Sequence, residues 1–305
     1  GLSRTTVTRA YAVLGEADPG RSFDLLSKVA TVADVLGDRA TQDATHAERA
    51  ALLERHPDDT RRAELLFSRA LLADRRGEAT ASEPLALQSF ELAERCGAAR
   101  FAAMAQGQLA WLHVARQDYA GATLHIEIGL PWAARIEGDK LRAETEAQLL
   151  TLSGMVAMQL SRLDEARRTL MAVLSRGEAL GKPRLQLGAL DNLAVIANTL
   201  GQWNDTAAWG ERILALADSI GSAQDVAGAR LRLAEAAEAR GDTAAALRWH
   251  ERGLVIHRAT ANRRMEAITQ RFLAGLNLTQ GDATTALQCG VESQTLHLDL
   301  NEPLE

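Results

Sequence analysis

Apolar residues recur at helical spacing through most of the chain. In the segments 210–221 (GERILALADSIG) and 231–241 (LRLAEAAEARG), Leu, Ile and Ala return every three or four positions. Positions i, i+3, i+4 and i+7 share one face of an α-helix, so this spacing predicts amphipathic helices that each bury one stripe. Strand-forming residues are scarce. The pattern therefore predicts an all-α chain.

A short polar turn separates the expected helices and recurs along the chain. It reads RGEATAS at 76–82, RGDTAAA at 240–246 and QGDATTA at 280–286. A Gly at its anchor position ends one helix in the left-handed conformation, and the Asp, Ser or Thr beyond it caps the next. Successive anchors lie 40, 40, 44, 40, 40 and 40 residues apart, at Gly37, Gly77, Gln117, Ser161, Gly201, Gly241 and Gly281. This series predicts seven antiparallel helix pairs.

Small residues stand at fixed distances from the anchors. Seven residues before each anchor are Ala30, Ala70, Ala110, Gly154, Ala194, Ala234 and Ala274. Five residues after the last five anchors are Ala122, Ala166, Thr206, Ala246 and Ala286. Small side chains allow two helices to pack closely, so we expect these positions at buried helix contacts.

The order of small residue, Gly and Ala across residues 21–301 resembles the consensus of tetratricopeptide repeats. The family's usual period is 34, and the Pro that ends its second helix is missing from most units here. A 40-residue period without that Pro resembles the repeats in the regulatory region of the maltotriose-responsive transcription activator and in related signalling ATPases. HEAT repeats share the spacing but not the small–Gly–Ala order. The resemblance implies a right-handed superhelical solenoid of about seven antiparallel helix pairs.

The repeat phasing predicts one domain over residues 1–305. Its repeats span approximately 21–57, 58–97, 98–138, 139–181, 182–221, 222–261 and 262–301. A lone helix over residues 3–14 is expected to precede them. Because the last repeat lacks the polar capping helix that solenoids normally need, we expect the chain to be a fragment of a longer protein. Pro131 interrupts the third repeat and has two interpretations, a hinge or an insertion tolerated on the outer face.

Charge and composition limit the classes of partner that we expect for this chain. The net charge is −6 and basic residues are scattered, which argues against nucleic-acid binding. No apolar run approaches the ~20 residues of a membrane span, and no signal sequence opens the chain. The preference for Arg over Lys, with abundant Ala, fits a GC-rich bacterial genome. We expect a bacterial, cytoplasmic protein with no membrane partner.

Candidate catalytic and metal-binding groups have simpler structural interpretations. Cys96 and Cys289 occupy repeat packing positions. His250 and His257 share a helix, seven residues apart, but no Cys or carboxylate completes a tetrahedral metal site with them. Glu235 and Glu238 resemble an acid–base dyad, yet a solvated helix face is the ordinary explanation for such a pair. The opening GLSRTTVTRAYAVL is similar to a recognition helix, but the two helices that such a helix needs do not precede it. We expect no catalytic site, no metal and no cofactor.

The resemblance implies that the first helix of each pair lines a concave groove. Carried over to this chain, the groove-facing offsets give the candidate ligand-binding residues Asp34, Asp74, Gln108, Trp111, Thr151, Met155, Asp191, Asn192, Asn198, Arg232, Glu235 and Arg271. Such a mixed surface suits an adaptable peptide or partner helix. The alternative is that some of these side chains seal the inside of the superhelix. The Lys-and-Asn clamp by which some members hold a peptide carboxylate is absent.

The leading hypothesis is a non-catalytic region that binds a protein, a peptide or a small effector. It would act as the sensor or scaffold of a bacterial regulatory protein in signalling or transcription regulation. The first alternative is a free-standing protein–protein adaptor, and a DNA-binding regulator and an enzyme come after it. Self-association through open solenoid ends is a further expectation.

Overall fold

The computed structural model describes residues 18–35, 38–260 and 262–299. These residues form fourteen α-helices and no strand, which confirms the all-α prediction. The helix predicted over residues 3–14 lies outside the described residues. In chain order the helices are α2 (Pro19–Val35), α3 (Arg39–Arg55), α4 (Asp59–Arg75), α5 (Ala79–Cys96), α6 (Ala99–Ala115), α7 (Tyr119–Ala134), α8 (Asp139–Gln159), α9 (Leu163–Ala179), α10 (Pro183–Thr199), α11 (Trp203–Ile220), α12 (Ala223–Ala239), α13 (Thr243–Ala259), α14 (Arg263–Thr279) and α15 (Ala283–Asp299).

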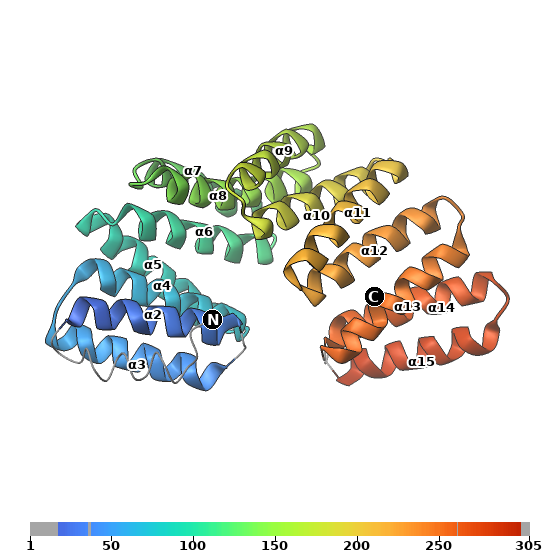
Figure 1. Cartoon of the computed structure of the whole chain (residues 1–305), viewed down its shortest axis with the longest axis horizontal. Helices are drawn as coiled ribbons and strands as arrows, with labels where there is room; N and C mark the ends of the chain where they lie inside the picture. Colours follow the sequence, from blue (N-terminus) through green and yellow to red (C-terminus); the bar gives the residue numbers. More distant parts are fainter. Residues whose placement is uncertain (1–17, 36–37, 261, 300–305) are drawn as a thin grey trace. The chain divides into compact units, whose positions relative to one another are not determined.

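The helices pack as a tandem series of hairpins (Figure 1). Each of the seven predicted repeats contains one helix pair, for example α4 and α5 within 58–97. Consecutive helices such as α4 and α5, or α12 and α13, pack against each other. The first helices of adjacent repeats also touch, as α4 touches α6 and α10 touches α12. This arrangement confirms the tetratricopeptide-like prediction of seven consecutive helix pairs.

The chain divides into two compact units, and the division falls inside α8 between Leu152 and Ser153. The N-terminal unit holds α2 to α7 with the first part of α8. The C-terminal unit holds the rest of α8 with α9 to α15. The single domain predicted over 1–305 stays a prediction.

Both units are built on small buried residues, as the repeat pattern predicts. Ala70 and Ala86 pack with Leu109 in the N-terminal unit, and Ala237 and Ala246 pack with Leu276 in the C-terminal unit. Gly154 shows how tight these contacts are, because a Cβ atom there would lie 2.8 Å from Leu170 on α9. Van der Waals contact begins near 3.5 Å, so an Ala here would require the Leu170 side chain to shift.

The Gly anchors among the described residues adopt the left-handed conformation expected of them. Gly201 and Gly241 have φ angles of 69° and 77°. Gln117 and Ser161, which replace Gly at this position, have φ angles of 59°. The hairpin therefore imposes this backbone conformation even on residues that favour it poorly.

Helix α7 continues through Pro131 and ends at Ala134. Pro131 is exposed, as is Glu127 one turn earlier, whose carbonyl loses its helical partner. Solvent reaches this side of the helix, so the lost hydrogen bond can be replaced by water. The structure fits the interpretation of an insertion tolerated on an outer face.

Candidate functional site

Three of the predicted contact residues, on α10 and α12 of the C-terminal unit, form ion pairs with one another. Arg232 of α12 donates from Nε to Oδ1 of Asp191 on α10 over 2.9 Å. Its Nη1 atom donates to both carboxylate oxygens of Glu235, over 3.2 and 3.0 Å. The guanidinium is 17% exposed, while the Asp191 and Glu235 side chains are 45% and 21% exposed. Burial would lower the pKa of Arg232, but the two carboxylates raise it, so this cation stays charged.

Amide side chains accompany this ion pair on α10. Asn192 donates from Nδ2 to the carbonyl of Gly188 over 2.8 Å, which fixes the amide plane and leaves Oδ1 as an acceptor. Asn198, about two turns further along α10, is half-buried, and its side chain makes no hydrogen bond with the described residues. Glu238 on α12 is exposed. Asp191, Asn192, Asn198, Arg232, Glu235 and Glu238 are called the α10–α12 face below.

The other predicted contact residues are distributed over both units. Trp111 on α6 is 40% exposed, whereas Gln108 on the same helix is 6% exposed and lies 3.5 Å from the Ser82 hydroxyl. Thr151 and Met155 on α8 and Asp74 on α4 are half-buried. Arg271 on α14 is exposed and lies over the ring of Phe272. The side chain of Asp34 lies outside those that the structure describes.

The structure brings together a polar cluster that the sequence analysis did not predict. His113 Nδ1 on α6 lies 2.7 Å from Oδ2 of Asp118, the residue that caps α7. His125 Nδ1 on α7 lies 2.7 Å from Oε1 of Gln106. The backbone N–H of Gly121 and the His113 ring lower the pKa of Asp118. Burial, with the nearby His113, lowers the pKa of His125. The two histidines are twelve residues apart on different helices, so no local sequence motif indicates that they lie close together.

A second unpredicted cluster lies between the first hairpin, α2 and α3, and helix α4. Arg49 on α3 is 1% exposed and donates from Nη2 to Oε1 of Glu64 on α4 over 2.8 Å. Its guanidinium carbon lies 4.4 Å from the centre of the Phe23 ring. Nearby, His46 Nε2 lies 2.9 Å from the Ser68 hydroxyl. Burial lowers the pKa of Arg49 to about 10. Helix α3 therefore buries a charged guanidinium at a position where α5 buries Ser89 and α9 buries Val173.

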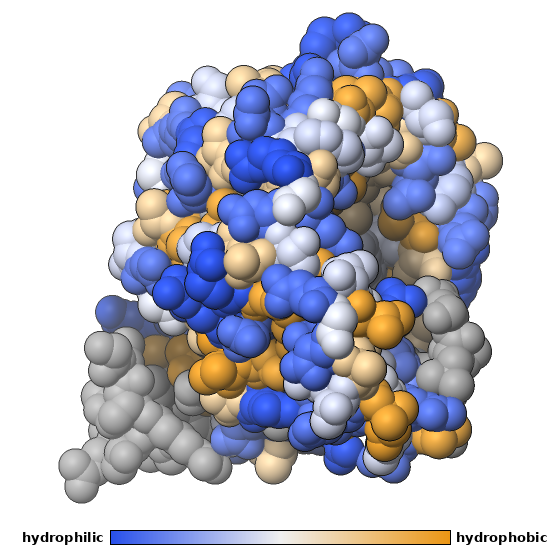
Figure 2. Space-filling model, turned by 90° about the vertical axis from the view of Figure 1, so that its right-hand side faces the viewer, coloured by the Kyte–Doolittle hydropathy of each residue, from blue (hydrophilic) through white to orange (hydrophobic). Residues whose placement is uncertain are grey.

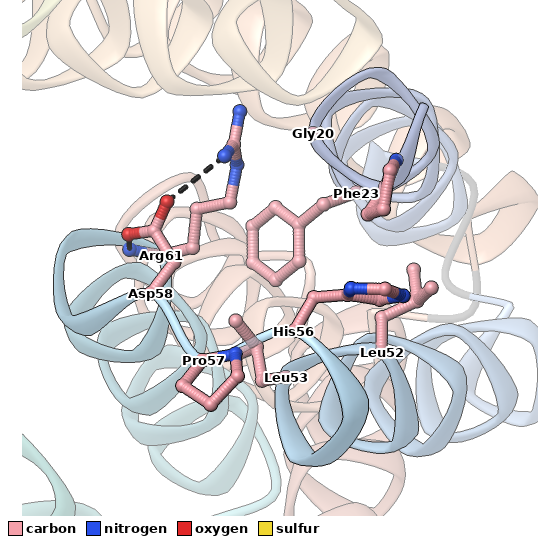
Figure 3. A pocket seen from close by; sticks show the side chains of 9 residues that line it. Gly20, Phe23, Leu52, Leu53, His56, Pro57, Asp58 and Arg61 are labelled. Atoms are coloured by element: carbon pink, nitrogen blue, oxygen red, sulfur yellow. Dashed lines mark hydrogen bonds and ion pairs between the residues drawn. The ribbon is translucent and has the colours of Figure 1, made fainter. Parts of the chain in front are cut away.

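Two surface hollows lie away from the predicted contact residues. The first, of about 210 Å³, is bounded by Phe23 of α2, Leu53 and His56 at the end of α3, and Arg61 of α4. Figure 3 shows the Phe23 ring between Arg61 and His56, with Arg61 turned toward Asp58. The second, of about 510 Å³, lies at the α10–α11 turn beside Trp203 and Arg240. Neither hollow includes a residue of the α10–α12 face.

Helix α15 carries an exposed apolar stripe. Leu287, Val291 and Leu298 are 70%, 54% and 63% exposed. Figure 2 shows hydrophobic side chains at the surface among hydrophilic ones on one side of the molecule. Val291 stands where the two preceding repeats have Glu211 and Glu251. The self-association predicted through the chain ends stays a prediction.

Metal-binding and membrane-spanning features were searched among the described residues. No three His, Cys, Asp or Glu side chains of these residues converge on a point that would suit a metal ion. None of the described helices is long and apolar enough to cross a membrane.

No family model and no curated protein sequence matches the chain. Solved structures do. A Rap protein complexed with competence and sporulation factor has a TM-score of 0.68 and 14% identity, over 92% of this chain and 80% of that one. A STAND signal-transduction ATPase with a tetratricopeptide repeat sensor, from Pyrococcus horikoshii, has a TM-score of 0.67 and 14% identity. That match covers 97% of this chain and 47% of the ATPase.

Aspartyl phosphate phosphatase F from Bacillus subtilis is also similar, with a TM-score of 0.58 and 11% identity over 97% of this chain and 95% of that one. At these identities the likeness concerns the fold. Together with the seven helix pairs and the left-handed anchors, it shows that the chain has the tetratricopeptide-like helical-repeat fold.

Proposed function

We propose that this chain is a protein- or peptide-binding repeat region and that its guest binds the α10–α12 face. The observation that carries the proposal is the Arg232 guanidinium held between Asp191 and Glu235 beside the amides of α10. Ion pairs and internal hydrogen bonds fix the side chains of Arg232, Asp191, Glu235 and Asn192 before any guest arrives. A guest therefore loses less conformational entropy on binding than it would on a surface of free side chains.

The chemistry of the face favours a polypeptide with basic side chains. Asp191, Glu235 and Glu238 supply three carboxylates against the one guanidinium of Arg232. The fixed Oδ1 of Asn192 can accept a hydrogen bond from a backbone N–H of the guest. The amide of Asn198 can both donate and accept. Basic side chains on the guest would meet Glu238, which is exposed to solvent.

We further propose that the chain acts as the sensor or scaffold region of a regulatory protein. Two proteins with a similar fold support it: a Rap protein complexed with competence and sporulation factor, and a STAND ATPase with a repeat sensor. A free-standing adaptor remains the alternative. The two differ in their response to a guest, since a sensor must change the activity of a linked domain whereas an adaptor only joins two chains.

We propose that the chain binds its guest without catalysing a reaction, although one protein of similar fold is named a phosphatase. Glu235, the strongest candidate for acid–base work in the sequence, is held by two hydrogen bonds from Arg232. A carboxylate bound in this way serves to position the guanidinium. Acyl phosphate hydrolysis that persists in wild type and is lost in Glu235→Gln would contradict this part of the proposal.

The test is a selection of random twelve-residue peptides displayed on phage against the immobilised chain. A synthetic copy of an enriched peptide is then added to the chain, and amide hydrogen exchange is followed by mass spectrometry. We expect peptides rich in Lys or Arg, and slower exchange in α10 and α12. Helix α5, in the other unit, serves as the internal reference and should exchange at an unchanged rate.

Two outcomes would overturn the proposal. One is the failure of any peptide to enrich over a support without protein. The other is protection confined to the α10–α11 turn or to the second helices α11 and α13, which would place the guest on a different surface.

A further inference from the structure

The two imidazoles of His113 and His125 lie against each other beside the α6–α7 turn. Their ring centres are 4.9 Å apart and their planes are tilted by 41°. His113 stands in the last turn of α6, and His125 stands in the second turn of α7. The pair therefore joins the two helices of the third repeat, far in sequence from the α10–α12 face.

In each of the two rings, the Nδ1 atom faces an oxygen atom. The ionised carboxylate of Asp118 can only accept, so His113 donates from Nδ1 over 2.7 Å. His125 Nδ1 likewise faces the amide oxygen of Gln106 over 2.7 Å. A neutral imidazole protonated at Nδ1 presents its lone pair at Nε2. Neither Nε2 atom has a hydrogen-bond partner among the described residues, and neither is sealed from solvent.

The spacing of the rings is compatible with two imidazoles that bind one ion. A metal at the usual Zn–N distance lies about 3.2 Å from a ring centre, so two rings at tetrahedral or octahedral angles have centres roughly 4.5–5.2 Å apart. The observed 4.9 Å falls within this range. An Asp that accepts from the Nδ1–H of a ligating His is also the usual outer partner at such sites.

We propose that His113 and His125 bind one divalent transition-metal ion of the zinc class through their Nε2 atoms, with Asp118 and Gln106 orienting the rings. This inference goes beyond the proposed function and departs from the sequence expectation of no metal. Imidazole ligands suit Zn²⁺, Ni²⁺ and Cu²⁺, whereas Mg²⁺ requires oxygen ligands. The ion ties α6 to α7 across their turn.

The protein supplies two ligands, and water completes the coordination. Glu83 on α5 is the nearby carboxylate, but Arg116 holds it over 2.6 Å. Asp118 is already shared between His113 and the backbone N–H of Gly121. This ligand count agrees with the lack of a three-residue cluster among the described side chains. The resulting site is open and exchanges its ion readily.

The first measurement is a calorimetric titration of Zn²⁺ into the chain, without a histidine tag and in excess Mg²⁺. We expect saturation at one Zn²⁺ per chain. His113→Gln and His125→Gln should each abolish this binding. His56→Gln changes an exposed histidine of the same unit and should leave it intact. Far-UV circular dichroism and thermal unfolding verify that each variant is folded.

Asp118→Asn is the sharpest variant. Asn keeps the acceptor that caps α7, because Asn and Asp cap helices equally well. Its amide would donate to His113 Nδ1, which moves the ring proton to Nε2 and blocks the metal. We expect affinity for Zn²⁺ to fall 10–100-fold, as is usual when an outer partner of a metal ligand is changed.

Ring tautomers give a readout that does not depend on metal affinity. Long-range ¹⁵N–¹H spectra of the metal-free chain should show both rings protonated at Nδ1, and Zn²⁺ should shift their Nε2 resonances. Saturable binding that survives both His→Gln variants, or no binding at one equivalent, would overturn the proposal. So would Nε2-protonated rings in the wild-type chain.

Discussion

Arg232 on α12 and Asp191 on α10 form an ion pair of 2.9 Å that links the first helices of two neighbouring repeats. The two residues are 41 positions apart, one more than the repeat period, so each stands near the same level of its helix. Glu235 holds the opposite side of the guanidinium. This pair sets the charge and the geometry of the α10–α12 face.

Arg232→Ala should lower the free energy of unfolding by about 1–2 kcal/mol, because it leaves two partly buried carboxylates without their cation. Urea titration measures the change. Arg263→Ala is the matched control, since Arg263 and Asp299 form a pair in which both side chains are 53% exposed. Its loss should be below about 0.5 kcal/mol. Equal losses in the two variants would show that the Arg232 pair behaves as a solvated surface pair.

The buried Arg49 depends on Glu64. Glu64→Gln should destabilise the chain by about 3 kcal/mol, because it leaves a cation that is 1% exposed without a counter-charge. Arg49→Met combined with Glu64→Gln should recover most of this loss, since a well-packed apolar side chain replaces the buried ion. A double variant no more stable than Glu64→Gln would contradict the assignment of the loss to unpaired charge.

The two anchors that are not Gly offer stabilising substitutions. Gln117→Gly and Ser161→Gly should each raise the free energy of unfolding by about 0.5–1 kcal/mol, because Gly removes the strain of a positive φ angle and this gain exceeds its entropic cost. Gly241→Ala should have the opposite sign at the same turn position. Thermal unfolding measures all three. Destabilisation by both Gly substitutions would mean that the side chains of Gln117 and Ser161 outweigh the backbone strain.

Two buried histidines predict loss of stability in mild acid. Burial, with the charges of Arg49 and Arg69, lowers the pKa of His46 to about 4, and burial lowers the pKa of His250 to about 4. Both folded-state values lie below the unfolded value of about 6.5, so the unfolded chain binds more protons between these limits. Their contribution is complete above pH 6.5 and is lost as the pH falls from 6.5 to 4, by roughly 3 kcal/mol for each residue.

His250→Leu removes the pH-dependent contribution of one of these two histidines to stability. The His250 ring stacks on Phe272, and its Nε2 atom is buried without a partner among the described residues. The variant should lose less stability between pH 6.5 and pH 4 than wild type, as urea unfolding at several pH values would show. An unchanged pH slope would mean that His250 already binds its proton in the folded chain.

The repeat could be predicted from the sequence because its physical causes are local and recur. The anchors of the turns and the buried small residues, such as Ala110 and Ala194, are each visible at a fixed spacing. These positions determine where helices end and how closely they pack. The left-handed φ of Gln117 and Ser161 was not predicted, because neither residue type favours this conformation.

The candidate sites could be predicted only in part. The offsets assign Asp191, Arg232 and Glu235 to one face, but spacing does not reveal which side chains pair. The cluster of His113, Asp118 and His125 was missed because no other repeat shares it: Trp209 and Trp249 occupy the position of His125. Arg49 was missed because polar residues along a helix such as α3 are typical of a solvent-exposed face. The sequence alone does not show that Arg49 contacts Glu64.

The most direct test of the account is the affinity of one enriched peptide for two variants, measured by isothermal titration calorimetry. Glu238→Gln removes the exposed carboxylate of the α10–α12 face that a basic side chain of the guest would meet. Glu211→Gln removes an exposed carboxylate on the second helix α11 and is the matched control. The account predicts at least a threefold loss of affinity in Glu238→Gln, about 0.6 kcal/mol, and none in Glu211→Gln. Wild-type affinity in a folded Glu238→Gln chain would contradict it.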